Sequence, residues 1–243
     1  MLETRRESVS RPAWIARRLA LFFLPLVLAA VYLLAVWDML VPAASAIVLT
    51  AMLTYLVSPL GVEIVVPSAV LALRLSPEVP DPNPAIAVAV LSVILVDVFT
   101  ALFLMWNFDL AERVPLLGGF IRKTETKARV VIERKKWGEE VTLAALVAYV
   151  ALPVQMSGGL VGSIFGRLLG IKPWKVFTAV TTGSTLGAVP FGIVSALIPL
   201  AELEKLVSWW EGLSITQVLG IVLLIVFVAV ILWIYLRGRA KNE

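Results

Sequence analysis

The sequence predicts an all-α polytopic membrane protein with about four full spans and two re-entrant, broken helical hairpins in an inverted repeat, with both termini cytoplasmic. Hydrophobic residues make up 60% of the 243 residues, and the mean hydropathy is +0.96. Only 16% of the residues are charged, against about a quarter in soluble domains. The charges are bunched, which leaves apolar stretches of about 20 residues, the length that crosses a ~30 Å hydrocarbon core.

Missing residue types exclude several kinds of chemistry. The chain has no cysteine and no histidine. It therefore has no disulfide, no thiolate nucleophile, no Cys-based metal site and no catalytic Ser-His pair, and it lacks the usual proton shuttle at neutral pH. No basic patch interleaved with aromatic residues indicates nucleic acid as a partner. We expect no enzyme, no cofactor and no metal site, and any proton coupling must use carboxylates.

We expect a single membrane domain over 1–243, and its first span covers 19–37. Five arginines precede this apolar run, which resembles a signal peptide but is too long for a typical signal core. We interpret it as a retained helix that starts inside and tolerates Pro25 as a kink.

The first predicted repeat covers 43–106. Its apolar stretch 43–75 is too long for one crossing and is interrupted by Pro59, Gly61, Glu63 and Pro67. We expect breaks of the hairpin at the two prolines. A polar turn over 76–84, with four prolines, leads to a continuous span over 85–106.

The second predicted repeat covers 141–200 and follows a charged cytoplasmic segment over 107–140. Within that segment, 121–137 predicts a basic amphipathic helix, either lying on the anionic inner leaflet or acting as a solvated connector. The stretch 141–171 is broken by Pro153 and by glycines, a basic turn follows at 172–175, and a span covers 176–199. An interfacial helix is expected over 202–211 and a last span over 215–236.

Basic residues decide how the two interrupted stretches are built. If each stretch enters and returns on one side, the eight basic residues of 107–140, the turn 172–175 and both termini are cytoplasmic. The turn 76–84, which has no basic residue, and the acidic segment 202–211 are then outside, as the positive-inside rule requires. If each stretch crossed once, the eight basic residues would lie outside. The hairpin interpretation therefore fits better.

The two stretches also resemble each other. Tyr55 and Pro59 share the spacing Tyr-x-x-x-Pro with Tyr149 and Pro153, at an offset of 94 residues. One hairpin would enter from outside and the other from inside. Paired broken segments of this kind indicate an inverted-topology repeat with a binding site near the membrane midplane.

Two motifs carry a resemblance to a known family. Residues 136–163, from Lys136 and Gly138 through an apolar run to Pro153 and Gly158, resemble the second signature of the small multidrug export protein family. Residues 59–67, a proline, a glutamate four residues on and a second proline, resemble its first signature. The resemblance covers about 45–190, and the family is distantly similar to the DedA/VTT group.

The resemblance implies paired re-entrant hairpins and transport of lipids or lipid-linked carriers, as in the DedA/VTT group. The chain departs from the family in two places. It has Val65 where an arginine usually follows the glutamate, and the turn after Pro153 contains Gln155 and Ser157 in place of the usual Pro-Gly-Thr-Gly pattern.

Two carboxylates are the strongest candidate site residues. Glu63 lies in a broken apolar stretch and Asp97 near the middle of an uninterrupted span. An ionised carboxylate at such depth is costly unless it is paired or hydrated, so both are candidates for proton coupling or substrate binding. Each could instead be structural, bonded to loose backbone or to a neighbouring polar group.

Arg167 is the candidate cation, preceded by a small-residue run. A half-helix starting near Ser157 would direct its N–H groups at the midplane and bind an anion, with Arg167 adding a bidentate clamp. Gln155, Gly158 and Gly159 would belong to the same pocket. The alternative role for the glycines is tight helix packing. For Arg74 we expect a long side chain that reaches the lipid headgroups.

These residues predict a transporter or flippase in the cytoplasmic membrane, with a midplane site for a lipid-linked or other amphipathic anionic substrate and possible proton coupling. A proton-coupled small multidrug exporter and a non-transport assembly protein are the alternatives. Expected partners are membrane lipids and a lipid-linked phosphate or hydrophobic small molecule, and the sequence leaves a homo-oligomer open.

Overall fold

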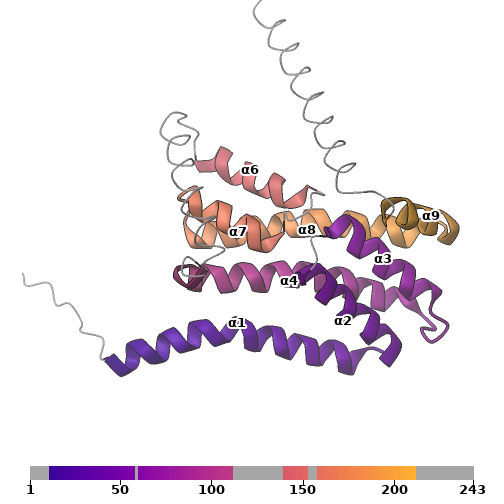
Figure 1. The fold of residues 1–243 in the computed structure, drawn as a ribbon, viewed down its shortest axis with the longest axis horizontal. Helices are drawn as coiled ribbons and strands as arrows, with labels where there is room; N and C mark the ends of the chain where they lie inside the picture. Colours follow the sequence, from indigo (N-terminus) through magenta and orange to yellow (C-terminus); the bar gives the residue numbers. More distant parts are fainter. Residues whose placement is uncertain (1–10, 58–59, 112–138, 153–157, 212–243) are drawn as a thin grey trace, which may run out of the picture. The chain divides into compact units, whose positions relative to one another are not determined.

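The structure, a computed structural model, describes residues 11–57, 60–111, 139–152 and 158–211, and these residues form helices joined by short turns (Figure 1). The chain divides into two compact units, Met1–Leu200 and Ala201–Glu243. The first unit contains all the helices discussed below except α9 (Leu200–Glu211), most of which belongs to the second unit.

Three helices of the first unit are long and apolar enough to cross a membrane. They are α1 (Arg11–Met39), α4 (Pro82–Ala111) and α8 (Pro173–Leu197). Helices α1 and α4 contain the spans predicted at 19–37 and 85–106, and α8 covers the span predicted at 176–199 except its last two residues. The chain is therefore a multi-pass membrane protein. The predicted span at 215–236 lies outside the described residues.

The two interrupted stretches each form two short helices instead of one straight helix. The first contains α2 (Pro42–Val57) and α3 (Val62–Leu75), and the second contains α6 (Glu139–Ala151) and α7 (Gly159–Leu168). Pro67 was expected to mark a break, but it lies buried inside α3, so the chain leaves its helical path before this proline. Pro59 and Pro153 lie outside the described residues.

Local sequence explains where several helices start and stop. Prolines occupy the first position of α2, α4 and α8, where the missing N–H would have no helical partner. At the end of α7, Gly170 adopts a φ of 75°, which favours glycine. The N–H of Ile171 then donates to the Gly166 carbonyl at 3.1 Å, closing the helix with a Schellman-type bond.

Helix α4 lies at the centre of the first unit, in contact with α1, α2, α3, α7 and α8. Three polar contacts fix α1 against it: Tyr32 to Ser92 at 2.9 Å, Asn107 to the Leu21 carbonyl at 3.1 Å, and Arg18 to Asp109 at 2.8 Å. Asn107 has non-helical angles (φ −123°, ψ 26°) and is buried. The kink therefore places the Asn107 amide on the α1 backbone, close to where the sequence predicts that the span ends.

Each predicted repeat has a short helix that packs on the long helix of the other repeat as well as on that of its own. Helix α3, from the first stretch, contacts α8 as well as α4, and α7, from the second stretch, contacts α4 as well as α8. A buried apolar cluster joins α4, α6 and α8; it comprises Ala101, Leu146, Val150, Ile171, Val176, Ala179 and Val180. The start of α7 and the end of α3 are therefore held by helices of the other predicted repeat.

Helix α9 is the helix that was expected over 202–211. It carries Glu202 in its first turn, and an exposed ion pair joins Glu202 to Lys205 at 3.4 Å. The Trp209 side chain is 57% exposed. The predicted amphipathic helix at 121–137 lies outside the described residues.

Candidate functional site

Asp97 is the centre of a buried polar cluster. Asp97 lies 15 residues after Pro82, where α4 begins, and 14 residues before Ala111, where it ends. The carboxyl is therefore about 22 Å from either end of the helix. Asp97 is 4% exposed. The Tyr55 hydroxyl donates a hydrogen bond to Asp97 Oδ2 at 2.9 Å, and the Gly159 N–H donates one to Oδ1 at 2.6 Å. One side chain therefore joins α2, α4 and α7.

The start of α7 is capped by this carboxylate from another helix. The N-cap residue of α7 is Gly158, which offers no side-chain cap to the free N–H groups at the helix start. Asp97 supplies the missing acceptor, and its negative charge suits the positive end of the helix dipole. The helix start that the sequence analysis assigned to an anionic substrate therefore binds the protein's own carboxylate in this structure.

Gly159 allows the two backbones to come close enough for this bond. A Cβ atom at position 159 would lie 2.6 Å from the Asp97 carbonyl oxygen and 2.7 Å from its Cα. A Cβ at position 158 would lie 2.9 Å from both Asp97 Oδ1 and the Tyr55 hydroxyl. The glycines therefore serve close packing, the alternative weighed from the sequence, and this packing brings the N–H to Asp97.

Tyr55 is a site residue that the sequence analysis did not assign. It stands in the last turn of α2, half-buried, and was noted only as part of the Tyr-x-x-x-Pro spacing. The signal that could have identified it is a phenol two residues before the end of an apolar helix, where a hydroxyl needs a partner. Only the packing of α2 on α4 shows that this partner is Asp97.

Glu63 lies in the first turn of α3, and its side chain is buried at 5% exposure. The carboxyl turns back toward its own backbone N–H and lies against Gly61, the N-cap residue of α3. Its Oε2 has no hydrogen-bond partner among the described residues. Glu63 is also near enough to Tyr55 to interact with it electrostatically. Both candidate carboxylates thus lie close enough to Tyr55 to interact with it.

Arg167 does not share a site with the start of α7. It lies in the last turn of that helix, eight residues after Gly159, which is about 12 Å along the axis. Its guanidinium lies over the Phe108 ring at 5.1 Å, and its Nε is buried without a hydrogen-bond partner among the described residues. The predicted anion clamp of Arg167 with Gly158 and Gly159 is therefore not assembled in this structure.

Arg74 has a structural contact instead of the expected reach to headgroups. Its Nη1 donates to the carbonyls of Ser195 at 3.1 Å and Ile198 at 2.8 Å. These carbonyls belong to the end of α8, where the helix dipole is negative. Arg74 therefore caps α8 and ties α3 to it.

The cluster around Asp97 carries no compensating positive charge from the part of the chain that the structure describes. Neither Asp97 nor Glu63 forms an ion pair with a described residue. Ser184 of α8 lies against the Asp97 carboxyl, but its hydroxyl makes no hydrogen bond there. The predicted site residues Gln155 and Ser157 lie outside the described ranges, and neither is basic. The described part of the site therefore has two acidic side chains and no basic side chain paired with them.

Residues 75–189 match the model of a protein family described as "putative small multi-drug export protein". The recognition made from the sequence is confirmed over this range, which includes Asp97, the second signature, half of the first predicted repeat and most of the second. The first signature at 59–67, with Glu63, precedes the match. No curated protein and no solved structure matches the chain.

Proposed function

We propose that this chain, matched over residues 75–189 by the small multi-drug export family, exports hydrophobic cations in exchange for protons. The observation that carries the proposal is the Asp97 carboxyl, buried at the middle of a helix long enough to span a membrane. It is held by two hydrogen-bond donors, and none of the described basic side chains is paired with it. A charged group at this depth is costly and typically marks an ion or substrate pathway.

A carboxylate in this position supports exchange because a proton and an organic cation neutralise the same charge. Only one of them can do so at a time, so binding of one lowers the affinity for the other. Asp97 would be the primary exchange site, and Glu63, with an unpartnered Oε2, the second. Tyr55 interacts with both carboxyls and, through its hydrogen bond, would keep the Asp97 carboxyl oriented.

Release of the Asp97 carboxyl would also change the fold locally. Its bond to the Gly159 N–H is charge-assisted, and such bonds are about twice as strong as neutral ones. A proton or a cation on Asp97 weakens that bond and leaves the start of α7 without its cap. Occupancy of the site would thus be coupled to movement of α7 against α4.

The membrane arrangement that suits this function is the one expected from the basic residues. In it, the pairs α2–α3 and α6–α7 are re-entrant hairpins that enter from opposite sides of the cytoplasmic membrane as an inverted repeat. The crosswise packing of α3 on α8 and of α7 on α4 supports this arrangement, since inverted repeats place their broken segments around one midplane site.

An anionic lipid or lipid-linked phosphate is the second candidate substrate. It is favoured by the start of α7, which binds a carboxylate through the Gly159 N–H. It is disfavoured because Arg167 lies at the other end of the helix and because the anion would have to displace Asp97. A third reading, a non-transport assembly role, would leave both carboxyls as structural caps.

Transport by protein reconstituted in liposomes separates these functions. We expect Asp97→Asn to abolish, and Glu63→Gln to reduce at least tenfold, the proton-driven movement of a fluorescent lipophilic cation. The matched controls Asp38→Asn and Glu78→Gln, which alter exposed carboxylates, should transport normally. Arg167→Ala should spare cation transport.

Two outcomes would reject the cation proposal. Loss of phospholipid scrambling in Arg167→Ala, with no cation movement by the unaltered protein, would favour the anionic substrate. Normal transport by Asp97→Asn would leave the carboxyl with a structural role.

A further inference from the structure

An apolar groove opens on the surface of the first unit beside the Asp97 cluster. It lies between α1, α2 and α4 and has a volume of about 580 Å³, within the range of about 300–1,000 Å³ typical of small-molecule sites. Thr100 is its one hydroxyl-bearing lining residue among twelve. The groove therefore has room for an apolar body and almost no polar group to orient it.

The groove borders the carboxyl cluster through direct chain neighbours. Leu56 of α2 and Val96 of α4 line it, and they are adjacent in sequence to Tyr55 and Asp97. The hydrogen-bonded Tyr55–Asp97 pair therefore lies one residue along the chain from the groove lining on each of these two helices. An apolar surface next to an unpaired buried carboxylate is complementary to a molecule that is apolar over most of its length and positive at one end.

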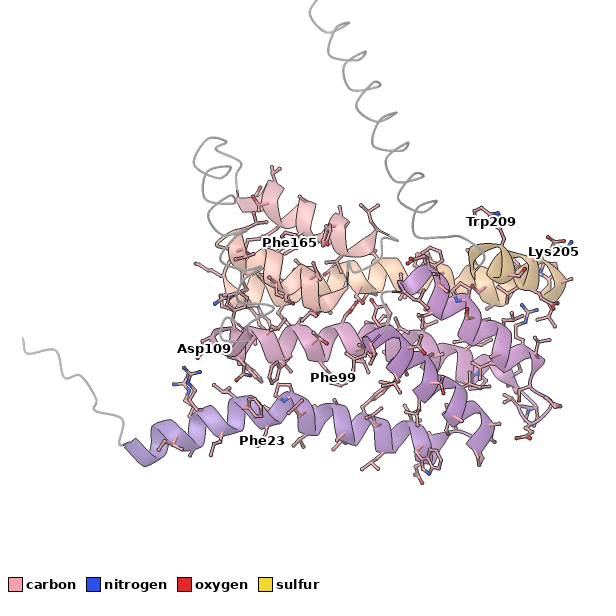
Figure 2. All side chains as sticks on the ribbon, in the orientation of Figure 1. Phe23, Phe99, Asp109, Phe165, Lys205 and Trp209 are labelled. Carbon is pink, nitrogen blue, oxygen red and sulfur yellow. The ribbon has the colours of Figure 1, made fainter. Side chains whose placement is uncertain are left out.

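Two aromatic rings give the groove a further preference. Phe99 and Phe103 line it from α4, and Figure 2 shows Phe99 on the side of α4 that faces α1. Phe99 also contacts Tyr32 of α1, with ring centroids 6.2 Å apart. Such rings favour aromatic partners by stacking or edge-to-face contact and attract cations to their faces.

We propose that this groove binds the apolar body of the transported cation, which enters sideways from the lipid phase between α1 and α4. The substrate class is then an aromatic lipophilic cation. Lateral entry is supported by the exposure of the lining residues Leu26 of α1, a candidate membrane span, and Leu53 and Leu56 of α2, a shorter apolar helix. This inference rests on the proposed function, because it requires Asp97 to receive the positive charge.

Two substitutions on one helix test the groove. Ala29 of α1 lines it, whereas Leu34 of the same helix is 70% exposed and does not. We expect Ala29→Phe to fill the groove and to lower the affinity of purified protein for tetraphenylphosphonium at least tenfold. The control Leu34→Phe adds a similar ring to the same helix and should bind as the unaltered protein does.

A second groove variant guards against failure of Ala29→Phe to fold. Phe99→Ala removes an aromatic wall without adding bulk, and we expect it to lower affinity for tetraphenylphosphonium about fivefold or more while thermal unfolding shows a single folded species. Binding by Ala29→Phe and Phe99→Ala at the level of Leu34→Phe would overturn the inference.

Asp97→Asn separates failure of this inference from failure of the proposed function. Loss of binding in Asp97→Asn with normal binding in the groove variants means that the cation binds at the carboxyl but not in this groove. If Asp97→Asn binds normally and the groove variants do not, the groove takes uncharged chains such as lipid tails, and both proposals fail. The inference requires both sets of variants to lose binding.

Discussion

At the scale of residues, a single carboxylate combines an observed structural contact with the exchange role proposed above. Asp97 is the strongest candidate for binding a proton or a cation, and it is also the cap that completes the start of α7. Tyr55 contributes the other hydrogen bond. Because hydrogen bonds to charged groups contribute about 1.5–3 kcal/mol, each of the two donors has a measurable effect on the charge of Asp97.

Tyr55→Phe removes one of these donors without changing the size of the ring. We expect affinity for a lipophilic cation to change by about tenfold and the pH profile of transport to move, because the ionised Asp97 loses a bond worth roughly 1.5–3 kcal/mol. Binding titrations at several pH values would measure both effects.

Tyr32→Phe is the matched control for that substitution. Tyr32 also bonds across helices, but to the neutral Ser92. It should lower thermal stability slightly and leave the pH profile of transport in place. Identical pH profiles for the two tyrosine variants would show that Tyr55 does not act through Asp97.

At the scale of elements, two helix ends are completed by side chains of other helices. The first turn of α7 is completed by α4, and the end of α8 is completed by Arg74 of α3. Inside a bilayer the apolar environment supplies little driving force for helix association, so close backbone approach and polar contacts carry more of it. The contact of α7 with α4 combines both at Gly159.

Gly159→Ala tests this contact. The added Cβ would lie 2.6 Å from the Asp97 carbonyl oxygen, so the start of α7 must move away and lose its bond to Asp97. We expect a fall in unfolding free energy of about 1–3 kcal/mol, as for overpacking in a protein core, together with loss of coupled transport. Thermal denaturation in detergent and liposome transport would measure the two effects.

Gly170→Ala is a useful comparison at the other end of the same helix. Position 170 has open space around it but a left-handed φ of 75°. The substitution should cost stability through backbone strain while transport continues. If Gly159→Ala behaved in the same way, the contact at the start of α7 would have no part in coupling.

At the scale of the whole molecule, the distribution of basic residues predicts orientation. The chain has no cysteine, so single cysteines report on one position each. We expect Glu78→Cys and Ser208→Cys to react with a membrane-impermeant maleimide from outside the cell. Lys172→Cys should react only after the membrane is opened.

The three positions are exposed, so access depends on the side of the membrane alone. Labelling of positions 78 and 172 from the same side would contradict the hairpin arrangement. It would mean that one of the interrupted stretches crosses the bilayer once.

The sequence by itself determined the membrane class, the three described spans, and the division of both long apolar stretches into paired short helices. These features follow from local composition: apolar length sets a span, and proline and glycine interrupt it. The sequence also singled out Glu63 and Asp97, because a carboxylate among apolar residues is conspicuous wherever the chain folds.

The tertiary structure decided which groups meet those carboxylates. Tyr55 and the Gly159 N–H are 42 and 62 residues from Asp97 along the chain, so their contact depends on how α2 and α7 cross α4. Arg167 is separated from the predicted clamp by the length of α7 itself, because residues eight apart in a helix lie about 12 Å apart along the axis. Hydrogen bonds form only within about 3 Å, and local sequence does not specify contacts of that precision between distant segments.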